Sequence, residues 1–373
     1  MSRPAIRFRT GDGFSSPLRL DEQEARGYGA AMHRALRLTV DRYAIQANWR
    51  WLQDFAGTPA GAAVKANAYG LGSREAVEAL AEAGCRNFFV STWAEAEALG
   101  PLPEGGSLVV LHGVGKDDAA AALQSSARPC LNTVEQVARW KEVAPDRPCD
   151  VMVDTGMNRL GLRPAEIDAL GGLNIDTLHS HLACADEDSA MSGMQLERFR
   201  AVASAVPARR YSLANSAGIC LGRDYSFDLV RPGISLYGGF HRAEAEGNIR
   251  QVARVEAQIV QRRTIPAGES CGYGATFIAK QDMQAAILNI GYADGYLRRF
   301  SSRGTAFAGE FALPVIGRVS MDLIAIDVDA APQLKEGEWV EVDYDLATAS
   351  EQSGLSQYEL LTGLGSRFER RWV

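Results

Sequence analysis

The sequence lacks the marks of a disulfide-stabilised, membrane-spanning or nucleic-acid-binding protein. Its six cysteines include no C-x-x-C pair, which predicts buried free thiols and neither a disulfide framework nor a zinc site. No apolar run reaches the ~18 residues that span a membrane. The net charge of -7 argues against nucleic acid as the main partner, because a phosphate-binding surface usually carries a basic excess.

A secretory signal is also missing from the start of the chain. The first 34 residues are rich in Arg, Gly and Ser and contain no continuous apolar segment. We therefore expect residues 1–35 to form a flexible extension and the protein to be cytoplasmic. With 373 residues, 46% of them hydrophobic and 23% charged, the chain is long enough for two globular domains.

Eight short apolar segments follow one another from residue 60. Their ranges are 60–64, 88–92, 108–112, 128–131, 150–154, 177–183, 210–214 and 228–230. Helix-compatible segments separate most of them, including 74–83, 133–143 and 193–206. Eight strand-then-helix units predict a parallel α/β sheet closed into a TIM (β/α)8 barrel, which we expect over 36–245.

The first strand of the chain is predicted before this series, at 36–40. Asp41 then caps a helix that runs to about residue 55. We expect the strand to pair either with the barrel or with the C-terminal domain.

The pattern changes near residues 240–250. Segments 254–261, 284–290, 313–316, 323–328 and 339–342 are β-rich, with Gly and Pro between them. No helical periodicity follows until about 356–361. The sequence therefore predicts a separate, mostly β domain over 246–373.

One lysine stands at the end of the first barrel segment, in the run A-V-K-A-N-A-Y-G. Lys65 at this place can present its amine to a pocket, where burial disfavours the ammonium form and makes the amine a better nucleophile. The alternative is a lysine that only reaches towards solvent from a strand end. Polar groups at the ends of other barrel segments weigh against that alternative.

These polar groups lie where TIM barrels carry their functional sites. They are Arg159 after the fifth segment, His181 late in the sixth, Asn215 and Ser216 after the seventh, and Arg231, Gly233 and Ile234 after the eighth. A serine hydroxyl with helix-start amides suits a phosphate, and a glycine lets the backbone approach an anion closely. A lysine and a phosphate cradle on one barrel face are what pyridoxal 5'-phosphate (PLP) requires.

Nine runs of the chain resemble motifs of the alanine racemase family, and the resemblance covers nearly all of the sequence from Leu36. The runs are AVKANAYG, VDTGMNRLG, HSHLACADED, LANSAG, LVRPGISLYG, CGYGATF, IGYADGYLRR, GRVSMD and SQYEL. Any one of them is weak evidence, whereas the set is specific. The resemblance implies a fold-type III PLP enzyme with an N-terminal barrel and a C-terminal β domain.

The resemblance also assigns roles around the cofactor. Lys65 would be the Schiff-base lysine, His181 would stack on the pyridine ring, and Arg231 would donate to the ring nitrogen. An arginine accepts no hydrogen bond and leaves that nitrogen unprotonated, which weakens the electron sink and limits transamination. The phosphate would be held by Tyr69, Asn215, Ser216, Gly233, Ile234 and Tyr358.

Racemisation needs a base on each face of the substrate, and the resemblance implies Lys65 on one face and Tyr273 on the other. A phenol usually titrates near ~10, so a tyrosine base needs cationic or hydrogen-bonding neighbours. A relay through His181 and Arg231 would meet that need. In the family this tyrosine comes from the second subunit, so the site would be complete only in a homodimer.

Substrate contacts follow from the same motifs. Arg159 and the Met321 amide would hold the substrate carboxylate, with Met321 and Asp322 contributed by the second subunit. Tyr292, Arg298 and Tyr358 would line the entrance. For Tyr292, Tyr296 and Tyr273, an ordinary packing role is the alternative. For Asp322, the alternative is a strand-end turn residue or cap.

The chain departs from the family pattern at Met152. Many members carry there a carbamylated lysine that orients the arginine corresponding to Arg159, and Asn158 also stands where glycine is common. We hypothesise that another anion or polar group orients Arg159, either a bound halide or Asn158 itself. The departure leaves the PLP assignment intact but bears on the choice of substrate.

A metal site is the remaining possibility in the sequence. His179 and His181 share one face of a strand, as a metal pair would. The other histidines, His33, His112 and His241, belong to no partner motif, so no metal is expected.

The leading hypothesis is a homodimeric, PLP-dependent racemase that interconverts L-alanine and D-alanine with Lys65 and Tyr273 as bases. The alternatives are a serine or broad-specificity racemase, a fold-type III decarboxylase, a non-catalytic PLP carrier and a metal-dependent barrel hydrolase. The sequence has no Gly-Gly-Gly phosphate loop for a decarboxylase, and a lone carrier barrel would not need the residues after 240.

Overall fold

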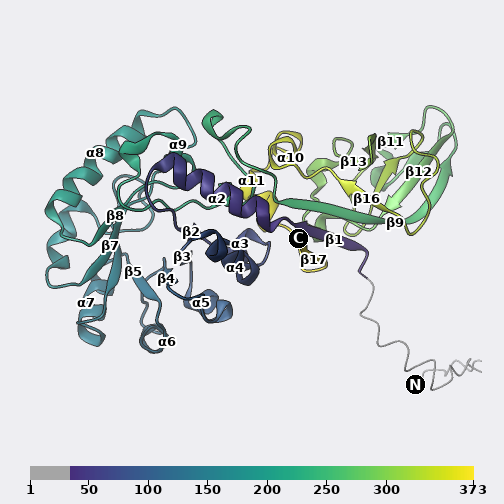
Figure 1. The fold of residues 1–373 in the computed structure, drawn as a ribbon. Helices are drawn as coiled ribbons and strands as arrows, with labels where there is room; N and C mark the ends of the chain where they lie inside the picture. The colour runs from purple at the N-terminus through teal and green to yellow at the C-terminus, as the bar shows by residue number, and fades with distance from the viewer. Residues whose placement is uncertain (1–33) are drawn as a thin grey trace, which may run out of the picture. The chain divides into compact units, whose positions relative to one another are not determined.

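The computed structural model describes residues 34–373, so the extension predicted over 1–35 lies almost wholly outside the described residues. Within this range the chain forms a parallel, barrel-like sheet and an antiparallel sheet (Figure 1). None of the helices from residue 34 onward is long and apolar enough to cross a membrane.

A seven-stranded parallel sheet forms the first part, in the order β2-β3-β4-β5-β6-β7-β8. Its strands are β2 (Ala62–Ala63), β3 (Asn87–Val90), β4 (Ser107–Val110), β5 (Arg128–Leu131), β6 (Cys149–Met152), β7 (Ile175–His179) and β8 (Arg210–Ser212). Most of their residues are buried, because helices cover the outside of the sheet and side chains fill the inside, which explains why apolar residues predominate in strands such as β3 and β4. The predicted α/β barrel class is confirmed.

The eighth predicted barrel strand, at 228–230, is not a strand in the structure. The segment nevertheless lies between β8 and the start of β2: the Asp228 amide donates to Tyr211 O (3.0 Å), and the Gly61 amide donates to Val230 O (2.9 Å). An isolated parallel bridge pairs Ala60 with Val230. The barrel is therefore closed by a segment too short, and too near Pro232, which has no amide hydrogen, to form a regular strand.

The described helices of the barrel are α2 (Arg42–Ala56), α3 (Lys65–Tyr69), α4 (Ser73–Ala83), α5 (Trp93–Leu99), α6 (Ala119–Gln124), α7 (Val134–Val143), α8 (Ala190–Ala205) and α9 (Ser216–Cys220). Five of these eight, α2, α5, α7, α8 and α9, begin at a residue whose side chain caps them. The Asp41 side chain accepts from the Ala44 amide, as predicted. Thr92 and Glu95 form a reciprocal capping box at the start of α5.

A buried ionic cluster fills the barrel interior below the site described next. Asp150 accepts from Arg128 Nε (2.9 Å) and contacts His179 Nε2 (2.8 Å). Asp176 lies beside Arg128 and Arg210. Desolvation would raise the pKa of Asp176, but its arginine neighbours outweigh this effect and lower that pKa to about 2. Asp176 is thus ionised at neutral pH, whereas burial lowers the pKa of His179 to about 4 and keeps its ring neutral.

The C-terminal part is an antiparallel sheet whose pairings form a ring, β9-β16-β13-β14-β15-β12-β9. Its strands are β9 (Ala253–Ile265), β12 (Met283–Leu288), β13 (Thr305–Ala308), β14 (Phe311–Ile316), β15 (Ile324–Asp327), β16 (Trp339–Val342) and β17 (Glu369–Trp372). β1 (Leu36–Val40) pairs antiparallel with β9 and parallel with β17. The first described strand therefore belongs to this sheet and not to the barrel.

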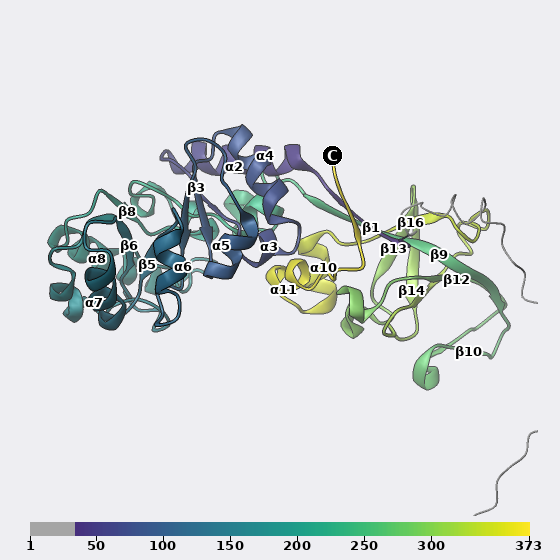
Figure 2. The ribbon, with the colours of Figure 1, turned by 90° about the horizontal axis from the view of Figure 1, so that it is seen from below.

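Two features of this part were missed by the sequence interpretation. A helix, α10 (Leu346–Ser353), precedes α11 (Gln357–Thr362), although no helical periodicity was expected before about residue 356. A short hairpin of β10 (Ser270–Cys271) and β11 (Phe277–Ile278) carries Tyr273 at its tip. Figure 2 shows the β10 segment extending away from the remaining strands of the domain.

Candidate active site

A cavity of about 640 Å³ opens at the carboxyl ends of the barrel strands. Ten of the predicted site residues line it: Lys65, Tyr69, Arg159, His181, Asn215, Ser216, Arg231, Gly233, Ile234 and Tyr358. Asp154, Asp186 and Met152 also line it. One lysine, two arginines and two carboxylates line this cavity, and the two arginine side chains suit an anionic ligand.

Lys65 begins an unusual left-handed turn. The four residues after it have φ values of 50° at Ala66, 54° at Asn67, 51° at Ala68 and 56° at Tyr69, although none of them is glycine. Each such residue costs roughly 1–2 kcal/mol relative to a right-handed conformation. The turn is therefore maintained by surrounding contacts and not by its own backbone preference.

The environment of Lys65 lowers the pKa of its amine. Desolvation by burial and, after it, the charge of Arg159 lower the pKa of Lys65, while the charge of Glu95 opposes them. A lowered pKa leaves more of the amine unprotonated at neutral pH. An unprotonated amine is the form that attacks an aldehyde carbon and that accepts a proton.

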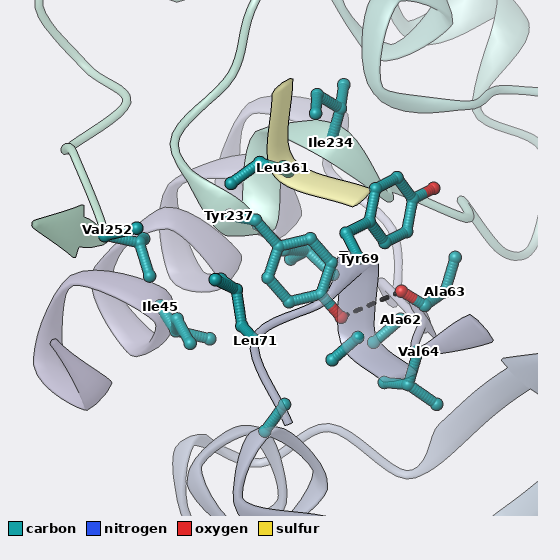
Figure 3. Packing of buried hydrophobic residues seen from close by; sticks show 14 of the residues in the cluster. Ile45, Ala62, Ala63, Val64, Tyr69, Leu71, Ile234, Tyr237, Val252 and Leu361 are labelled. Carbon is teal, nitrogen blue, oxygen red and sulfur yellow. Dashed lines mark hydrogen bonds between the residues drawn. The ribbon is translucent and has the colours of Figure 1, made fainter. Parts of the chain in front are cut away.

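A cluster around Gly233 forms one end of the cavity. The Ser216 hydroxyl accepts from the amides of Gly233 (2.9 Å) and Ser235 (3.3 Å). A Cβ at Gly233 would clash with the Tyr69 hydroxyl, so only glycine fits there. Tyr69 lies against Tyr237 at 4.9 Å between ring centroids, and Figure 3 shows both rings among the buried residues around this turn.

The Asn215 side chain forms a hydrogen bond with the backbone in this cluster. Its side-chain oxygen accepts from the Gly218 amide (2.8 Å) and so caps α9. At the outer edge, the Tyr358 ring stacks on His241 at 5.6 Å, and burial followed by the charge of Asp186 raises the pKa of Tyr358.

Arg231 is buried with its guanidinium directed by neighbouring strands. It donates to the Ser212 hydroxyl, to Ser180 O (2.5 Å) and to Leu213 O (3.4 Å). Burial lowers its pKa to about 10, so it stays protonated at neutral pH. Its hydrogen-bond partners are neutral, which leaves its charge available to a ligand in the cavity.

The two histidines of the H-S-H run have different surroundings. His181 lines the cavity, and burial with the charges of Arg231 and Arg159 lowers its pKa to about 3, so the ring is neutral. His179 is fully buried, and its Nε2 contacts Asp150. No group of three or more His, Cys, Asp or Glu side chains within residues 34–373 could hold a metal.

Arg159 and its neighbours bear on the departure at Met152. Met152 packs against Phe89 and Cys130 in the barrel interior. The Asn158 amide group donates to Gly156 O (3.4 Å), within its own turn, and does not reach Arg159. The structure therefore shows no hydrogen bond by which Asn158 would orient this arginine. Among residues 34–373, no side chain forms a hydrogen bond with Arg159.

Three predicted site residues do not line this cavity: Tyr273, Met321 and Tyr292. Tyr273 is 65% exposed and Met321 is 53% exposed. The Tyr292 amide donates to Ser320 O (3.0 Å), so the turn that carries Tyr292 is joined to the loop that carries Met321. Arg367 connects the same turn and loop, since it contacts both Asp294 and Asp322.

Sequence reasoning missed two groups, one that contacts a predicted site residue and one that contacts the neighbour of another. Ser212 accepts from Arg231, and nothing in its sequence position indicates this role. Glu95 accepts from the amide of Ala66, next to Lys65. The T-x-x-E capping pattern that includes Glu95 was visible in the sequence, although its contact with the lysine turn was not. Tyr296, by contrast, is fully buried and stacks on Phe300.

Comparisons with known proteins agree with this geometry. The sequence matches the family models "Alanine racemase, N-terminal domain" over residues 40–240 and "Alanine racemase, C-terminal domain" over 252–372. A catabolic alanine racemase of Agrobacterium fabrum is 39% identical over 375 aligned residues, covering 95% of each chain. An alanine racemase of Methylobacterium nodulans is 40% identical and covers 92% of this chain and 98% of its own.

The chain is also similar to solved structures of alanine racemases. The alanine racemase of Bartonella henselae, crystallised with covalently bound pyridoxal phosphate, has a TM-score of 0.84 at 35% identity and covers 91% of this chain and 100% of its own. A biosynthetic alanine racemase from Pseudomonas aeruginosa has a TM-score of 0.81 at 33% identity, with the same two coverages.

Proposed function

Because this chain belongs to the alanine racemase family, we propose that it is a PLP-dependent enzyme that interconverts L-alanine and D-alanine. The observation that carries the proposal is the cavity at the barrel mouth, where a lysine with a lowered pKa meets a buried arginine and a glycine–serine cradle. The six cysteines are all unpaired, which supports a cytoplasmic location.

The residues of this cavity fit PLP. Lys65 supplies an amine for a covalent bond to the cofactor aldehyde, and Ser216, Tyr69 and Tyr358 supply hydroxyl groups near one end of the cavity. Gly233 leaves a space there that a single Cβ would fill. Arg231 would donate to the pyridine nitrogen, and the neutral His181 ring would lie against the pyridine face.

When bound, PLP withdraws electrons from the amino acid and acidifies its Cα–H bond. Lys65 then takes or returns the Cα proton on one face, and the Tyr273 hydroxyl does so on the opposite face. Arg159 holds the substrate carboxylate, assisted by the Met321 amide. Tyr292, which does not line the cavity of its own chain, would line the entrance and restrict the site to small side chains.

A homodimer completes the site in this proposal. Tyr273 and Met321 are exposed on the C-terminal domain and do not line the cavity of their own chain. An exposed tyrosine at the tip of a hairpin supports a role at the active site of a second copy. The isologous interface of a two-fold dimer would supply both sites in the same way.

The proposal is tested by giving the purified protein, with PLP, single L-amino acids and quantifying both enantiomers by chiral chromatography. L-alanine and D-alanine should each be converted to an equal mixture. Formation of D-serine or other D-amino acids without D-alanine would instead favour a serine or broad-specificity racemase. Release of carbon dioxide without a second enantiomer would favour a decarboxylase.

Replacing Gly233 with alanine is expected to weaken PLP binding about 10- to 100-fold. The new Cβ would clash with the Tyr69 hydroxyl, and the Tyr69 ring is buried against Tyr237 and has little room to move. Overpacking of this kind costs about 1–3 kcal/mol. Titration of the protein with PLP, followed by visible absorbance, measures the affinity.

Gly193 offers the matched control for this substitution. It lies in α8, where no neighbouring atom is within 4 Å of the position that a Cβ would take and the backbone is not left-handed. Gly193→Ala should bind PLP like the wild type and unfold at the same or a slightly higher temperature. Equal PLP affinity in the two variants would show that Gly233 is not part of the cofactor site.

A further inference from the structure

Lys65 depends on a backbone conformation that its own turn does not favour. The four left-handed residues after it include three, Ala66, Ala68 and Tyr69, whose side chains disfavour this conformation. On the preceding side, the chain is fixed by the Tyr237 hydroxyl, which donates to Ala63 O (2.9 Å), as Figure 3 shows. The contacts that fix the chain after Lys65 therefore decide in which direction the Lys65 side chain points.

One carboxylate contacts the peptide directly after Lys65. The Ala66 amide donates to Glu95 Oε1 (2.9 Å). Other contacts of the turn lie further along: the Ser73 amide donates to the Asn67 side chain (2.9 Å), and Arg370 donates to Gly70 O (2.9 Å). Of these contacts, the one with Glu95 is the nearest to the lysine.

Glu95 is itself held in one orientation by the start of α5. Its second oxygen, Oε2, accepts from the amides of Ser91 (2.6 Å) and Thr92 (3.4 Å), and its own amide donates to the Thr92 hydroxyl (3.2 Å). A carboxylate can accept on both oxygens at once, and such charge-assisted bonds are stronger than neutral ones. A glutamine offers one acceptor oxygen and cannot make both sets of bonds.

We propose that Glu95 is a positioning residue for Lys65, a role that rests on the proposed function: its carboxylate joins the α5 start to the Lys65–Ala66 peptide and thereby aims the lysine amine at the PLP aldehyde. Glu95 touches neither the cofactor nor the substrate in this role. Its negative charge also acts on Lys65, because it partly offsets the effect of Arg159 on the charge state of the lysine amine.

The test compares Glu95→Gln with wild-type protein after removal of PLP. Covalent attachment of added PLP, followed by visible absorbance, should weaken about 10- to 100-fold in the variant, as expected for loss of one charge-assisted hydrogen bond. Modification of Lys65 by a small amine-reactive ester, read by mass spectrometry, should not slow, because the amine remains accessible. The first readout reports whether the Lys65 amine is directed at the PLP aldehyde, and the second reports whether that amine is accessible.

Glu166 supplies the matched control. It caps the 3-10 turn η1 (Pro164–Leu170) with the same bond, accepting from the Arg163 amide (2.8 Å), and it does not line the cavity. Glu166→Gln should lose a similar amount of thermal stability and keep wild-type PLP attachment. Glu95→Asp keeps the negative charge and the backbone bond to the Thr92 hydroxyl, but its carboxylate is one methylene too short for Ala66, so it too should attach PLP weakly even if the glutamine variant folds poorly.

Wild-type PLP attachment in both Glu95 variants would overturn the proposed role. Slower ester modification of Lys65 in Glu95→Gln would also overturn it, because it would indicate that the amine has become buried and not misdirected. A wild-type protein that forms no covalent bond with PLP would refute the proposed function itself.

Discussion

Replacing Lys65 with alanine is expected to abolish covalent PLP attachment and to lower racemisation by at least about 10⁴-fold. The substitution removes both the amine that bonds the cofactor and the base on one face of the substrate, and a single positioned acid or base already contributes about 10²–10⁴-fold. The rate of D-alanine formation from L-alanine measures the loss of racemisation. Borohydride treatment followed by peptide mass spectrometry measures the loss of attachment, because it should add PLP to the Lys65 peptide of the wild type alone.

The variant should remain folded, because burial of the Lys65 amine disfavours its charged form and its loss removes no structural hydrogen bond seen in residues 34–373. Lys335→Ala is the control, since Lys335 is an exposed lysine remote from the cavity. After borohydride treatment, Lys335→Ala should carry PLP on the Lys65 peptide, and it should racemise alanine at the wild-type rate. PLP found on another lysine, with activity retained in Lys65→Ala, would contradict the assignment.

The barrel could be predicted from the sequence because most residues of its strands are buried, although β8 is only partly so. Segments such as 108–112 and 128–131 are apolar almost throughout, and they form β4 and β5 at nearly the expected places. The closing segment, by contrast, takes its hydrogen bonds from the two ends of the sheet, and no local pattern indicates how short it is. The helix α10 was missed because its sequence, LATASEQS, has little apolar periodicity, although Asp345 caps it by accepting from the Thr348 amide.

Only part of the candidate site could be predicted from the sequence, and the reason is physical. Glycine, serine and arginine at strand ends have local signals, since parallel strands bring their carboxyl ends to one barrel face. The left-handed turn after Lys65 has no such signal, because three of its four residues, Ala66, Ala68 and Tyr69, disfavour that conformation. Its conformation comes from contacts with Glu95 and the C-terminal segment, which are remote in sequence.

Tyr273→Phe is the second substitution with a large expected effect. It removes one hydroxyl from the exposed hairpin tip and should lower racemisation about 10²–10⁴-fold, while PLP attachment through Lys65 stays unchanged. In deuterated water, exchange at Cα should survive for the enantiomer that Lys65 deprotonates and be lost for the other. Equal deuterium incorporation from L-alanine and D-alanine would contradict the two-base model.

Mixing the two inactive variants tests where Tyr273 acts. If Tyr273 acts on the cavity of a second copy, a mixed dimer of Lys65→Ala and Tyr273→Phe contains one site with both groups intact and one site with neither. Random exchange of subunits should then restore about one quarter of wild-type activity, because about half of the dimers are mixed and each mixed dimer has one complete site. If both groups acted within one chain, every site would lack a base and no mixture would regain activity. Recovery of activity on mixing therefore requires both a dimer and an active site that is shared between its two subunits.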